Sequence, residues 1–449
     1  MAHVRVGKML GIFATMLLAA AAFADSQARI VRLSDVQGNV QIDRRTGEGF
    51  ESALQNLPVT QGTRISTRDD GRVEIEFEDG STVRLAPNSS VEFTRLSLRD
   101  SGAKNTELDL SEGTAYFNID LGKRDDFVVD LGHRAINLER SARFRATMDA
   151  SQAHVAVSRG QVEVQAQGSD AITVDKNRTA SFDLSNQEVY SVDRGYDEGP
   201  YEDWNDDLDS YHQKNAVQTS GDSPYAYGFS DLNYYGSYIS NPGFGSCWRP
   251  YFASFGWDPF ADGTWVWYPG FGYTWVSSYP WGWAPYRYGS WNYQQSSGWC
   301  WQPGNWNQWV VAPRFINRPT GYHPPVPPAD GHGRVPRIRG NTVAGGVTPR
   351  GGTPMPRGVR VPATGEAGLG VPRGHTNLGR LSTPPEPGSR GFNNLERGNR
   401  TGQGAAVENN RPGIGRSPAP RSAPAPSIPA APAPSPRSAP APRGGGGRG

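Results

Sequence analysis

The chain has 449 residues, of which 45 are Lys or Arg and 44 are Asp or Glu, so its net charge is only +1. Beyond the N-terminal segment no stretch approaches the roughly 20 apolar residues of a membrane helix, which excludes a protein with several membrane spans. The neutral total conceals an uneven distribution, because residues 25–311 carry a net charge of −15 and residues 312–449 carry +14. We therefore expect an acidic folded body with a basic tail, long enough for two or three domains.

Residues 1–24 have the pattern of a signal peptide. Arg5 and Lys8 precede an apolar run that ends in Ala22-Phe23-Ala24, an A-x-A cleavage signal. The run is short for a bilayer span of about 20 residues, so we expect cleavage, and an uncleaved anchor is the alternative. No cysteine stands at the cleavage point, which disfavours a lipoprotein. The sequence thus predicts an exported protein, in the periplasm or at the surface of a bacterial cell.

Residues 28–193 are predicted to form short strands with little helix. Val73–Glu78 alternates strictly between apolar and acidic residues, Asp79-Gly80 supplies a turn, and Ser81–Leu85 returns as the second arm of a hairpin. Similar strand segments follow at Ala115–Ile119, Phe127–Leu131, His154–Val157 and Gln161–Val164. Short strands with glycine turns between them predict a mostly β fold, as a sandwich, a roll or a solenoid.

The acidic row Glu74, Glu76 and Glu78 lies on one face of the predicted strand, opposite its apolar residues. We interpret this row as a solvated strand face, and a cation site is the alternative. No paired acid and base, Ser/His/Asp set or Cys/His set is visible, and His133 and His154 are isolated. We therefore expect no catalytic residues, no metal site and no cofactor, and a protein that is not an enzyme.

Four segments of this region resemble the FecR periplasmic domain, which is named after a regulator of ferric-citrate uptake. They are Gly62–Thr67, Val73–Ser89, Leu110–Phe117 and Val157–Val164. The resemblance implies a fold like a β-solenoid or a roll, and contact with other proteins or the cell envelope.

Two departures from the FecR pattern limit what the resemblance implies. Ser141-Ala142-Arg143-Phe144 stands where the family often has Gly-Thr-x-Phe. A signal peptide stands where regulatory members carry a sigma-binding segment and a membrane helix. We therefore do not expect direct anti-sigma activity.

Residues 194–230 are predicted to be an acidic, partly helical linker. Trp204 and Leu208 would lie on one helix face and dock on a neighbour. Asp203–Asp209 places oxygen ligands at alternate positions, as a calcium loop begins, but Leu208 and Lys214 stand where an EF-hand needs Gly and Glu. The linker is therefore favoured over a calcium site.

All thirteen tryptophans lie between Trp204 and Trp309, and most belong to a repeat in residues 231–311. The repeat units begin with Tyr235–Tyr238, Asp262–Trp265 and Tyr288–Trp291, at spacings of 27 and 26 residues. Each unit holds two aromatic strand segments, so we expect each to form a β-hairpin. The motif Pro280–Trp291 resembles the Trp-rich domain of unknown function that often follows FecR domains in exported bacterial proteins, a resemblance that implies no activity.

The two cysteines of the chain, Cys247 and Cys300, occupy equivalent positions in the first and third units, with Thr274 at that position in the second. Outside the cytosol a pair of cysteines usually forms a disulfide, which we expect here. The alternative is two free thiols packed beside Trp rings.

Aliphatic residues are scarce in the repeat region, so the rings themselves must build its core. A small meander cannot bury a dozen indoles on one side, and we expect some rings to remain exposed as a binding platform. The candidates are Trp265, Trp267, Trp275, Trp283, Trp291 and Trp301. Such a platform suits sugar rings, Pro-rich peptides or cations. Envelope glycan is the preferred ligand, and the chain's own tail, rich in Pro and Arg, is its rival.

Residues 312–449 are rich in Pro, Gly, Ala, Ser and Arg and are predicted to be a long disordered tail. Its charge favours anionic envelope polymers as a partner over nucleic acid, because the chain is expected to be exported. Taken together, the sequence predicts a non-enzymatic envelope protein that binds or scaffolds glycan, anionic polymer or protein partners. The alternative function is an accessory in FecR-type envelope signalling that contacts an outer-membrane receptor. The oligomeric state stays open.

Overall fold

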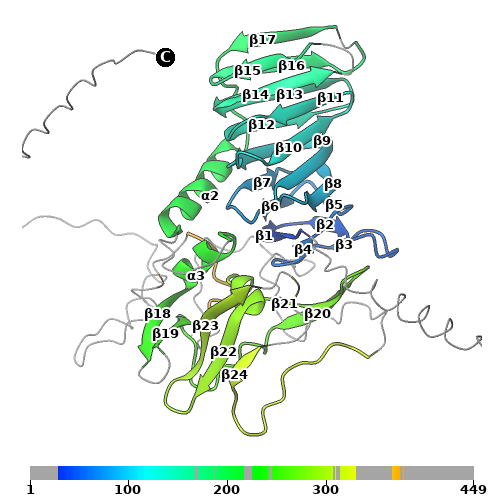
Figure 1. Ribbon diagram of the computed structural model, residues 1–449. Helices are drawn as coiled ribbons and strands as arrows, with labels where there is room; N and C mark the ends of the chain where they lie inside the picture. The colour runs from blue at the N-terminus through cyan, green and yellow to red at the C-terminus, as the bar shows by residue number, and fades with distance from the viewer. Residues whose placement is uncertain are drawn as a thin grey trace, which may run out of the picture. The chain divides into compact units, whose positions relative to one another are not determined.

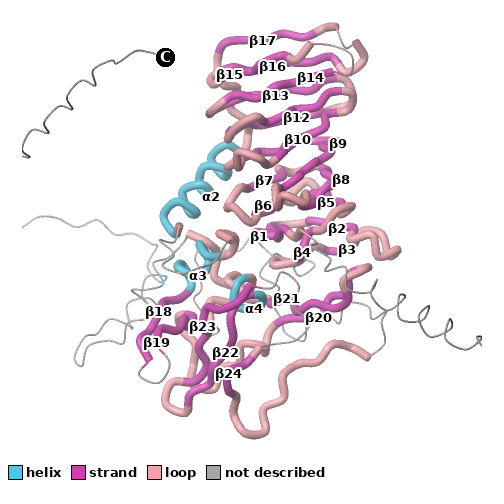
Figure 2. The backbone as a smooth tube through the Cα atoms, in the orientation of Figure 1, coloured by secondary structure: helices cyan, strands magenta, loops and turns pink. Residues whose placement is uncertain are grey.

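The computed structural model describes residues 29–166, 170–186, 188–216, 225–241, 245–306, 309, 314–329, 367–374 and 378. All of them belong to one compact unit, Met1–Pro384, and the second unit, Pro385–Gly449, lies outside the described residues. The expected signal peptide and most of the expected tail also lie outside them. Strands predominate over helices in the described part of the chain, as predicted (Figure 2).

The first seventeen strands are linked by hydrogen bonds into one assembly (Figure 1). It divides into two sheets that share β9, which we name sheet A and sheet B. In spatial order, sheet A contains β4 (Pro58–Val59), β1 (Val31–Gln37), β6 (Arg72–Glu76), β7 (Thr82–Leu85), the second half of β9 (Lys104–Ile119), β12 (Ala142–Met148), β13 (Gln152–Arg159), β16 (Arg178–Asp183) and β17 (Tyr190–Arg194). Sheet B contains β3 (Glu51–Ser52), β2 (Val40–Asp43), β5 (Arg64–Thr67), β8 (Ser90–Leu98), the first half of β9, β10 (Asp126–Leu131), β11 (Arg134–Leu138), β14 (Gln161–Ala166) and β15 (Ile172–Asp175).

Strand β9 belongs to both sheets. Its first half pairs with β8 and, in parallel, with β10 in sheet B, and its second half pairs with β7 and β12 in sheet A. The passage lies near Gly113, whose φ of +86° suits glycine and where a Cβ would lie 2.3 Å from the Asn88 carbonyl oxygen. Glycine at this position therefore lets one strand join the two sheets.

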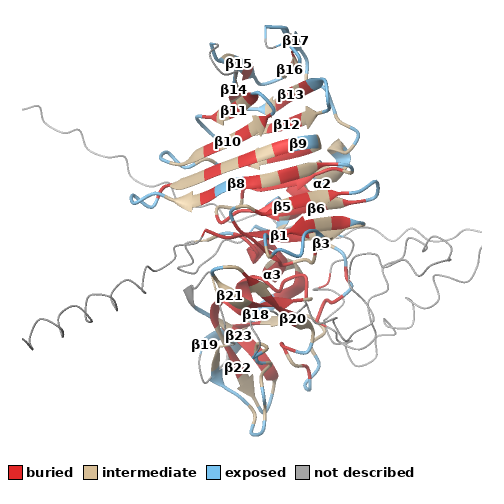
Figure 3. Ribbon diagram, turned by 90° about the vertical axis from the view of Figure 1, so that its right-hand side faces the viewer, coloured by how far each residue is buried: buried red, intermediate tan, exposed pale blue. Residues whose placement is uncertain are grey.

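The inward faces of both sheets supply one apolar core. The predicted hairpin is present, with Val73 opposite Leu85 and Ile75 opposite Val83, and all four side chains are buried. Figure 3 shows buried and less buried positions alternating along the strands, as side chains do on a half-buried strand. Phe144, in the segment that departs from the FecR pattern, still enters the core and stacks on Phe117 at 4.6 Å. The other strand segments predicted from the sequence are also strands.

Two helices follow the sheets, α2 (Glu202–Asn215) and α3 (Phe229–Tyr235). Figure 1 shows α2 running beside sheet A. Leu208 is buried, and Trp204 lies under the guanidinium of Arg72 at 5.5 Å. The linker is therefore partly helical, as expected, and it docks on the sheet that precedes it.

Each of the three repeat units forms a β-hairpin, as predicted. The hairpins are β18 (Gly236–Asn241) with β19 (Gly245–Pro250), β20 (Gly263–Tyr268) with β21 (Gly272–Ser277), and β22 (Tyr288–Gln294) with β23 (Gly298–Trp306). Helix α4 (Ala284–Arg287) precedes the third hairpin, and β24 (Phe315–Asn317) pairs with β22. The first and third hairpins meet through β19 and β23 in one five-stranded sheet, whereas the second stands as a separate pair.

The cysteines occupy the equivalent positions that the repeat predicts. Cys247 lies opposite Ile239, Thr274 opposite Val266, and Cys300 opposite Asn292 in the three hairpins. Strands β19 and β23 are neighbours, and the Cα atoms of Cys247 and Cys300 are 5.8 Å apart, with the sulfur atoms at disulfide distance. The expected cysteine pairing is confirmed.

The second hairpin packs against the core of the sheets. Val266, Tyr268 and Val276 are buried in the same apolar cluster as the sheet residues. The Tyr268 hydroxyl donates to the Pro58 carbonyl at 2.6 Å, and the Asn56 amide donates to the carbonyl of Tyr279 at 2.8 Å. The N-terminal sheets and the aromatic region are therefore one packed body within the described residues.

Candidate functional site

The outer face of sheet A carries charged side chains in cross-strand pairs. Glu74 lies opposite Arg84, whose Nε donates to Glu74 Oε2 at 2.9 Å. Glu76 lies opposite Arg32, whose Nη1 is 3.4 Å from Glu76 Oε2. Opposite charges facing each other on neighbouring strands stabilise the sheet, and here they also form a polar layer.

This layer is buried, and the expected solvated strand face is wrong. Glu74, Glu76 and Glu78 are exposed by 0%, 2% and 2%. Each carboxylate has an arginine partner, including Arg29, whose Nε donates to Glu78 Oε1 at 2.6 Å. Strand alternation correctly placed the three side chains on one face. It could not show that residues more than a hundred positions later cover that face.

Helix α2 covers one part of the charged layer. Asp209 forms ion pairs with Arg84 and Arg143, whose Nη1 atoms lie 2.7 Å and 2.9 Å from its carboxylate oxygens. His212 Nε2 lies 3.0 Å from Glu74 Oε1. The acidic residues that could have begun a calcium loop thus include one that pairs with arginines of the sheet.

Residues 226–231 cover another part. The backbone amide of Gly228 donates to Glu76 at 3.1 Å, and the Asp231 carboxylate accepts from Arg32 Nη2 at 2.6 Å. Asp231 is 1% exposed and also accepts from the Tyr211 hydroxyl at 2.7 Å. Its carboxylate therefore links α3 to sheet A and to α2.

A segment of the expected disordered tail completes the cover, which corrects the prediction for these residues. We call Ala367–Gly374 the docked tail segment. Ala367, Leu369 and Val371 are buried among the aromatic rings. Trp281 Nε1 donates to the Ala367 carbonyl at 2.6 Å, and the Tyr235 hydroxyl donates to the Val371 carbonyl at 2.7 Å. Two backbone carbonyls of the segment are therefore bound by ring donors.

Arg373 anchors this segment in the charged layer. Its Nε and Nη2 each donate to Asp231 at 3.0 Å, and its Nη1 donates to Glu74 Oε1 at 2.8 Å. The side chain is only 6% exposed, and its guanidinium lies 5.1 Å from the centre of the Tyr211 ring. A bidentate pair of this kind is both strong and geometrically selective. We define the tail site as the residues that hold the segment: Glu74, Tyr211, Asp231, Tyr234, Tyr235 and Trp281.

The surrounding charges set the ionisation of the site. Burial alone would raise the pKa of Glu74, but His212, Arg84 and Arg373 hold it well below its usual range. Burial also opposes ionisation of Asp231, yet Arg373 and Arg32 lower its pKa. For His212, burial alone would lower the pKa, and the Glu74 carboxylate raises it. The carboxylates and cationic side chains of the layer therefore stabilise each other in their charged forms.

The six tryptophans expected to form an exposed platform are mostly core residues. Trp265, Trp275, Trp283, Trp291 and Trp301 are exposed by 6% or less, and only Trp267 is half-buried. They pack in a network of rings, for example Trp265 against Trp275 at 5.5 Å. Trp283 faces the guanidinium of Arg287 at 3.8 Å, and burial lowers the pKa of Arg287 to about 10. The rings thus replace an aliphatic core, which was the first role expected of them.

The docked tail segment also supplies aliphatic side chains that the repeat region lacks. The buried aromatic cluster contains six aliphatic residues, and four of them come from the tail: Ala367, Leu369, Val371 and Leu378. The tail therefore contributes to the core as well as to the charged layer. The high proportion of Pro, Gly and Arg over residues 312–449 masked this short apolar stretch.

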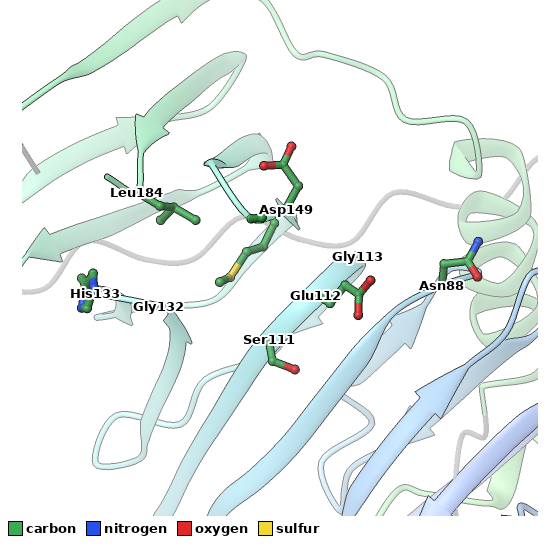
Figure 4. A pocket seen from close by; sticks show the side chains of 10 residues that line it. Asn88, Ser111, Glu112, Gly113, Gly132, His133, Asp149 and Leu184 are labelled. Carbon is green, nitrogen blue, oxygen red and sulfur yellow. The ribbon is translucent and has the colours of Figure 1, made fainter. Parts of the chain in front are cut away.

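A separate open pocket of about 600 Å³ is lined by residues of β9 and of the turns that follow β7, β10, β12 and β16. Its lining includes Ser111, His133 and Asp149, the residue types of a catalytic triad. Figure 4 shows their side chains at separate points of the lining, and Asp149 accepts hydrogen bonds from Ser151 and Gln152 while Ser111 donates to the Ser90 carbonyl. These contacts give the pocket no nucleophile activated by a base.

Two kinds of feature are absent from the described residues. These residues contain no group of three His, Cys, Asp or Glu side chains placed to hold a metal ion. None of the helices described is long and apolar enough to cross a membrane.

Comparison with known proteins gives two family matches. Residues 63–163 match the family described as FecR protein, and residues 229–329 match a family of unknown function, DUF6600. The order is the one that the sequence motifs indicated. No curated protein matches the chain.

Two crystal structures of a candidate anti-sigma factor from Parabacteroides distasonis ATCC 8503 are similar to part of the chain. They are 18% and 20% identical to it, each with a TM-score of 0.26. Each match covers 30% of this chain and 60% of the other protein, which is less than two thirds of that protein's length.

Proposed function

We propose that this chain is a non-enzymatic, protein-binding accessory of FecR-type signalling in the cell envelope. The observation that carries the proposal is the tail site, where the FecR-like sheet and the aromatic region jointly hold a peptide segment that contains turns. Glu74 of the sheet and Asp231 of α3 bind the same guanidinium, so neither region forms the complete site by itself.

The chemistry of the site favours a peptide as its ligand. Ring donors bind backbone carbonyls, which every peptide has, and two carboxylates select an arginine. Proteins that bind peptides commonly combine hydrogen bonds to the peptide backbone with selective contacts to a few side chains. A glycan would need exposed rings, and five of the six candidate rings are buried. The signalling accessory is therefore favoured over a scaffold for glycan or anionic polymer.

The proposal can be tested in cells that lack the protein. Three complemented strains are compared with the deletion strain, carrying the wild-type chain, Asp231→Asn, or the matched control Asp203→Asn on the exposed side of α2. Transcript profiles and the outer-membrane proteins that co-purify with the tagged chain are measured in each strain.

We expect deletion to change a defined set of transcripts, and the wild-type and Asp203→Asn chains to restore them, while Asp231→Asn does not. Melting curves establish that Asp231→Asn still folds. A deletion that leaves both the transcripts and the co-purifying proteins unchanged would falsify the proposal.

A further inference from the structure

The two sheets have two ends, and only one of them is covered in the described part of the chain. At the first end, the Tyr268 hydroxyl donates to the carbonyl of Pro58 in β4, and the second hairpin packs on the core. At the other end, sheet A finishes with β17, which pairs with β16 and with no other described strand. Figure 1 and Figure 3 both show β17 as the last strand, at the end opposite the hairpin of β20 and β21. The outer edge of β17 is therefore open among the described residues.

Apolar side chains of the inward face are uncovered at this open end. Tyr190 lies opposite Phe182, and Val192 lies opposite Ala180. Phe182 and Ala180 are buried in the core, and directly opposite residues share a face of the sheet, so Tyr190 and Val192 also face inward. Tyr190 is nevertheless 51% exposed and Val192 is only partly buried. Structures built from stacked strands need a cap or a neighbour at such an end.

Strand β17 lacks several features that commonly protect an edge strand from pairing with another chain. Such edges carry lysine, proline or a bulge. Tyr190–Arg194 has the sequence Tyr-Ser-Val-Asp-Arg, and its ladder with β16 runs without a shift in register. Its two charged residues, Asp193 and Arg194, have opposite signs. Whether they block or favour pairing therefore depends on the residues that they meet.

Antiparallel pairing of β17 with the same strand of a second copy matches these residues. A twofold axis through Val192, the middle residue, pairs all five residues of the strand, and any shift pairs fewer of them. Tyr190 then lies opposite Arg194 of the second copy, Ser191 lies opposite Asp193, and Val192 lies opposite Val192. An arginine beside an aromatic ring, a hydroxyl beside a carboxylate and two β-branched side chains are favourable cross-strand pairs.

This arrangement also improves the surroundings of Arg194. Within one chain, Arg194 lies directly opposite Arg178 on β16, and like charges at such positions destabilise a sheet. On the other side of β17, the second copy would place the ring of Tyr190 beside the same guanidinium, which an aromatic ring attracts. Pairing of two copies therefore offsets a repulsion that the single chain keeps.

We propose that β17 pairs with β17 of a second copy of this chain, so that sheet A continues through a symmetric dimer. The pairing gives hydrogen-bond partners to the open edge and covers the inward-facing Tyr190 and Val192. One strand from each copy makes a small interface, so the dimer forms in concentrated protein. The inference does not depend on the proposed function, because no residue of the tail site takes part.

Cysteine cross-linking of the full chain tests the register. Val192→Cys places a cysteine on the twofold axis, where opposite Cα atoms are about 4.5–5.5 Å apart, within reach of a disulfide. Val189→Cys is the matched control, because Val189 is 52% exposed but lies three residues from the axis. That offset separates the two introduced cysteines by about 20 Å. Cys247 and Cys300 are buried and joined to each other, so they do not contribute.

Both cysteine variants are treated with a mild oxidant and run on non-reducing gels. We expect Val192→Cys to form a covalent dimer about tenfold faster than Val189→Cys or more, because a disulfide requires close Cα atoms. Random collision would favour the more exposed position, Val189. Equal rates, or a faster rate at Val189, would overturn the inference.

Two substitutions at one position test the pair between Tyr190 and Arg194. Tyr190→Lys places a lysine opposite the arginine of the second copy, and Tyr190→Glu places a carboxylate there. Both put a charge at the same half-exposed site, and melting curves establish that both variants fold. Sedimentation velocity is measured on the two variants and on the wild-type chain over a range of concentrations. The wild-type chain is also measured at high salt, which screens attraction between the acidic body and the basic tail.

We expect the wild-type sedimentation coefficient to rise with concentration, at high salt as well. Tyr190→Lys should dimerise about tenfold more weakly than Tyr190→Glu or worse, because each dimer contains two such pairs. Equal dimerisation of the two variants would overturn the inference.

The wild-type chain and Val192→Cys keep Tyr190, so their results do not depend on how well the Tyr190 variants fold. If the wild type stays a single chain at every concentration and Val192→Cys does not cross-link, the edge has another occupant or none, and the inference is wrong. If the chains pair while the transcripts of the deletion strain are unchanged, the proposed function fails and this inference stands.

Discussion

Arg373 is the residue on which the tail site depends most. It lies 299 positions from Glu74 and 142 from Asp231, and its guanidinium binds both carboxylates. A lysine offers one point charge, whereas the planar guanidinium can donate to Asp231 with two nitrogens and to Glu74 with the third. Without it, the two carboxylates would keep Arg84, Arg32 and His212 as cationic partners, and the hydroxyls of Ser34 and Tyr211 as donors.

Replacing Arg373 by Ala should destabilise the fold by about 3 kcal/mol, because a buried carboxylate that loses its partner keeps its desolvation cost. Arg318→Ala, at an exposed arginine, is the control and should change stability little. Urea unfolding of both variants measures the difference. Equal unfolding midpoints would show that the arginine adds nothing to stability.

His212 should give the fold a specific pH dependence. Burial alone would lower its pKa, but Glu74 raises the pKa above the usual 6.5. The protonated form therefore stabilises the folded state fully below about pH 6.5, and this contribution is lost as the pH rises through the folded-state pKa. We expect His212→Gln to be less stable than wild type near pH 6, and the difference in stability to be smaller near pH 9. Urea midpoints that differ by the same amount at both pH values would contradict this.

The sequence was informative about side-chain direction but not about burial. Glu74 was correctly placed opposite the apolar face of its strand, since the two-residue period determines that. Its burial depends on Asp231, His212 and Arg373, which belong to three other segments. No local pattern around Glu74 contains that information.

At the scale of elements, the repeat was the most reliable guide. A recurrence near 26 residues predicted three hairpins and the equivalent positions of the two cysteines, because each unit is one supersecondary structure with one register. The repeat could not predict which hairpins would lie side by side in one sheet. Only the first and third share a sheet, and the second packs on the N-terminal core.

The bond between Cys247 and Cys300 should stabilise this arrangement measurably. It joins β19 to β23 across a sequence separation of 53 residues, and closing a loop of that length is worth about 4 kcal/mol in the chain-entropy estimate. We expect the double variant Cys247→Ser/Cys300→Ser to melt at a lower temperature than wild type. Dithiothreitol should lower the wild-type Tm toward that of the variant and leave the variant unchanged. A wild-type Tm that reductant does not alter would argue against the bond.

At the scale of the molecule, the described regions pack against one another more extensively than the composition of the chain indicates. Two regions with separate family matches share buried residues, and a third segment from the tail joins both. Domain boundaries were drawn from shifts in composition, and such shifts do not reveal packing between segments. The octapeptide Ala367–Gly374 lies inside a tail of 138 residues whose overall composition opposes folding.

Truncated chains can measure how much the docked tail segment and the rest of the tail each contribute to stability. A chain that ends at Pro384 keeps the docked tail segment and Leu378, and its Tm should equal that of the full chain. A chain that ends at Glu366 loses four buried aliphatic side chains and Arg373, and its Tm should fall by roughly 5 °C or more. Differential scanning calorimetry of the two chains makes the comparison. Equal Tm values would mean that the docked segment contributes nothing to stability.

Because Arg373 lies late in the chain, the charged layer and the aromatic cluster can be completed only late in translation. Glu74 is translated almost three hundred residues before its last partner, and the aromatic cluster that starts at Phe229 is filled only when Leu378 has emerged. Until then, carboxylates and rings that the finished protein buries remain accessible to water, chaperones and proteases. A chain that stops before Arg373 therefore leaves these groups accessible, and proteases and chaperones can distinguish it from a chain that extends past Leu378.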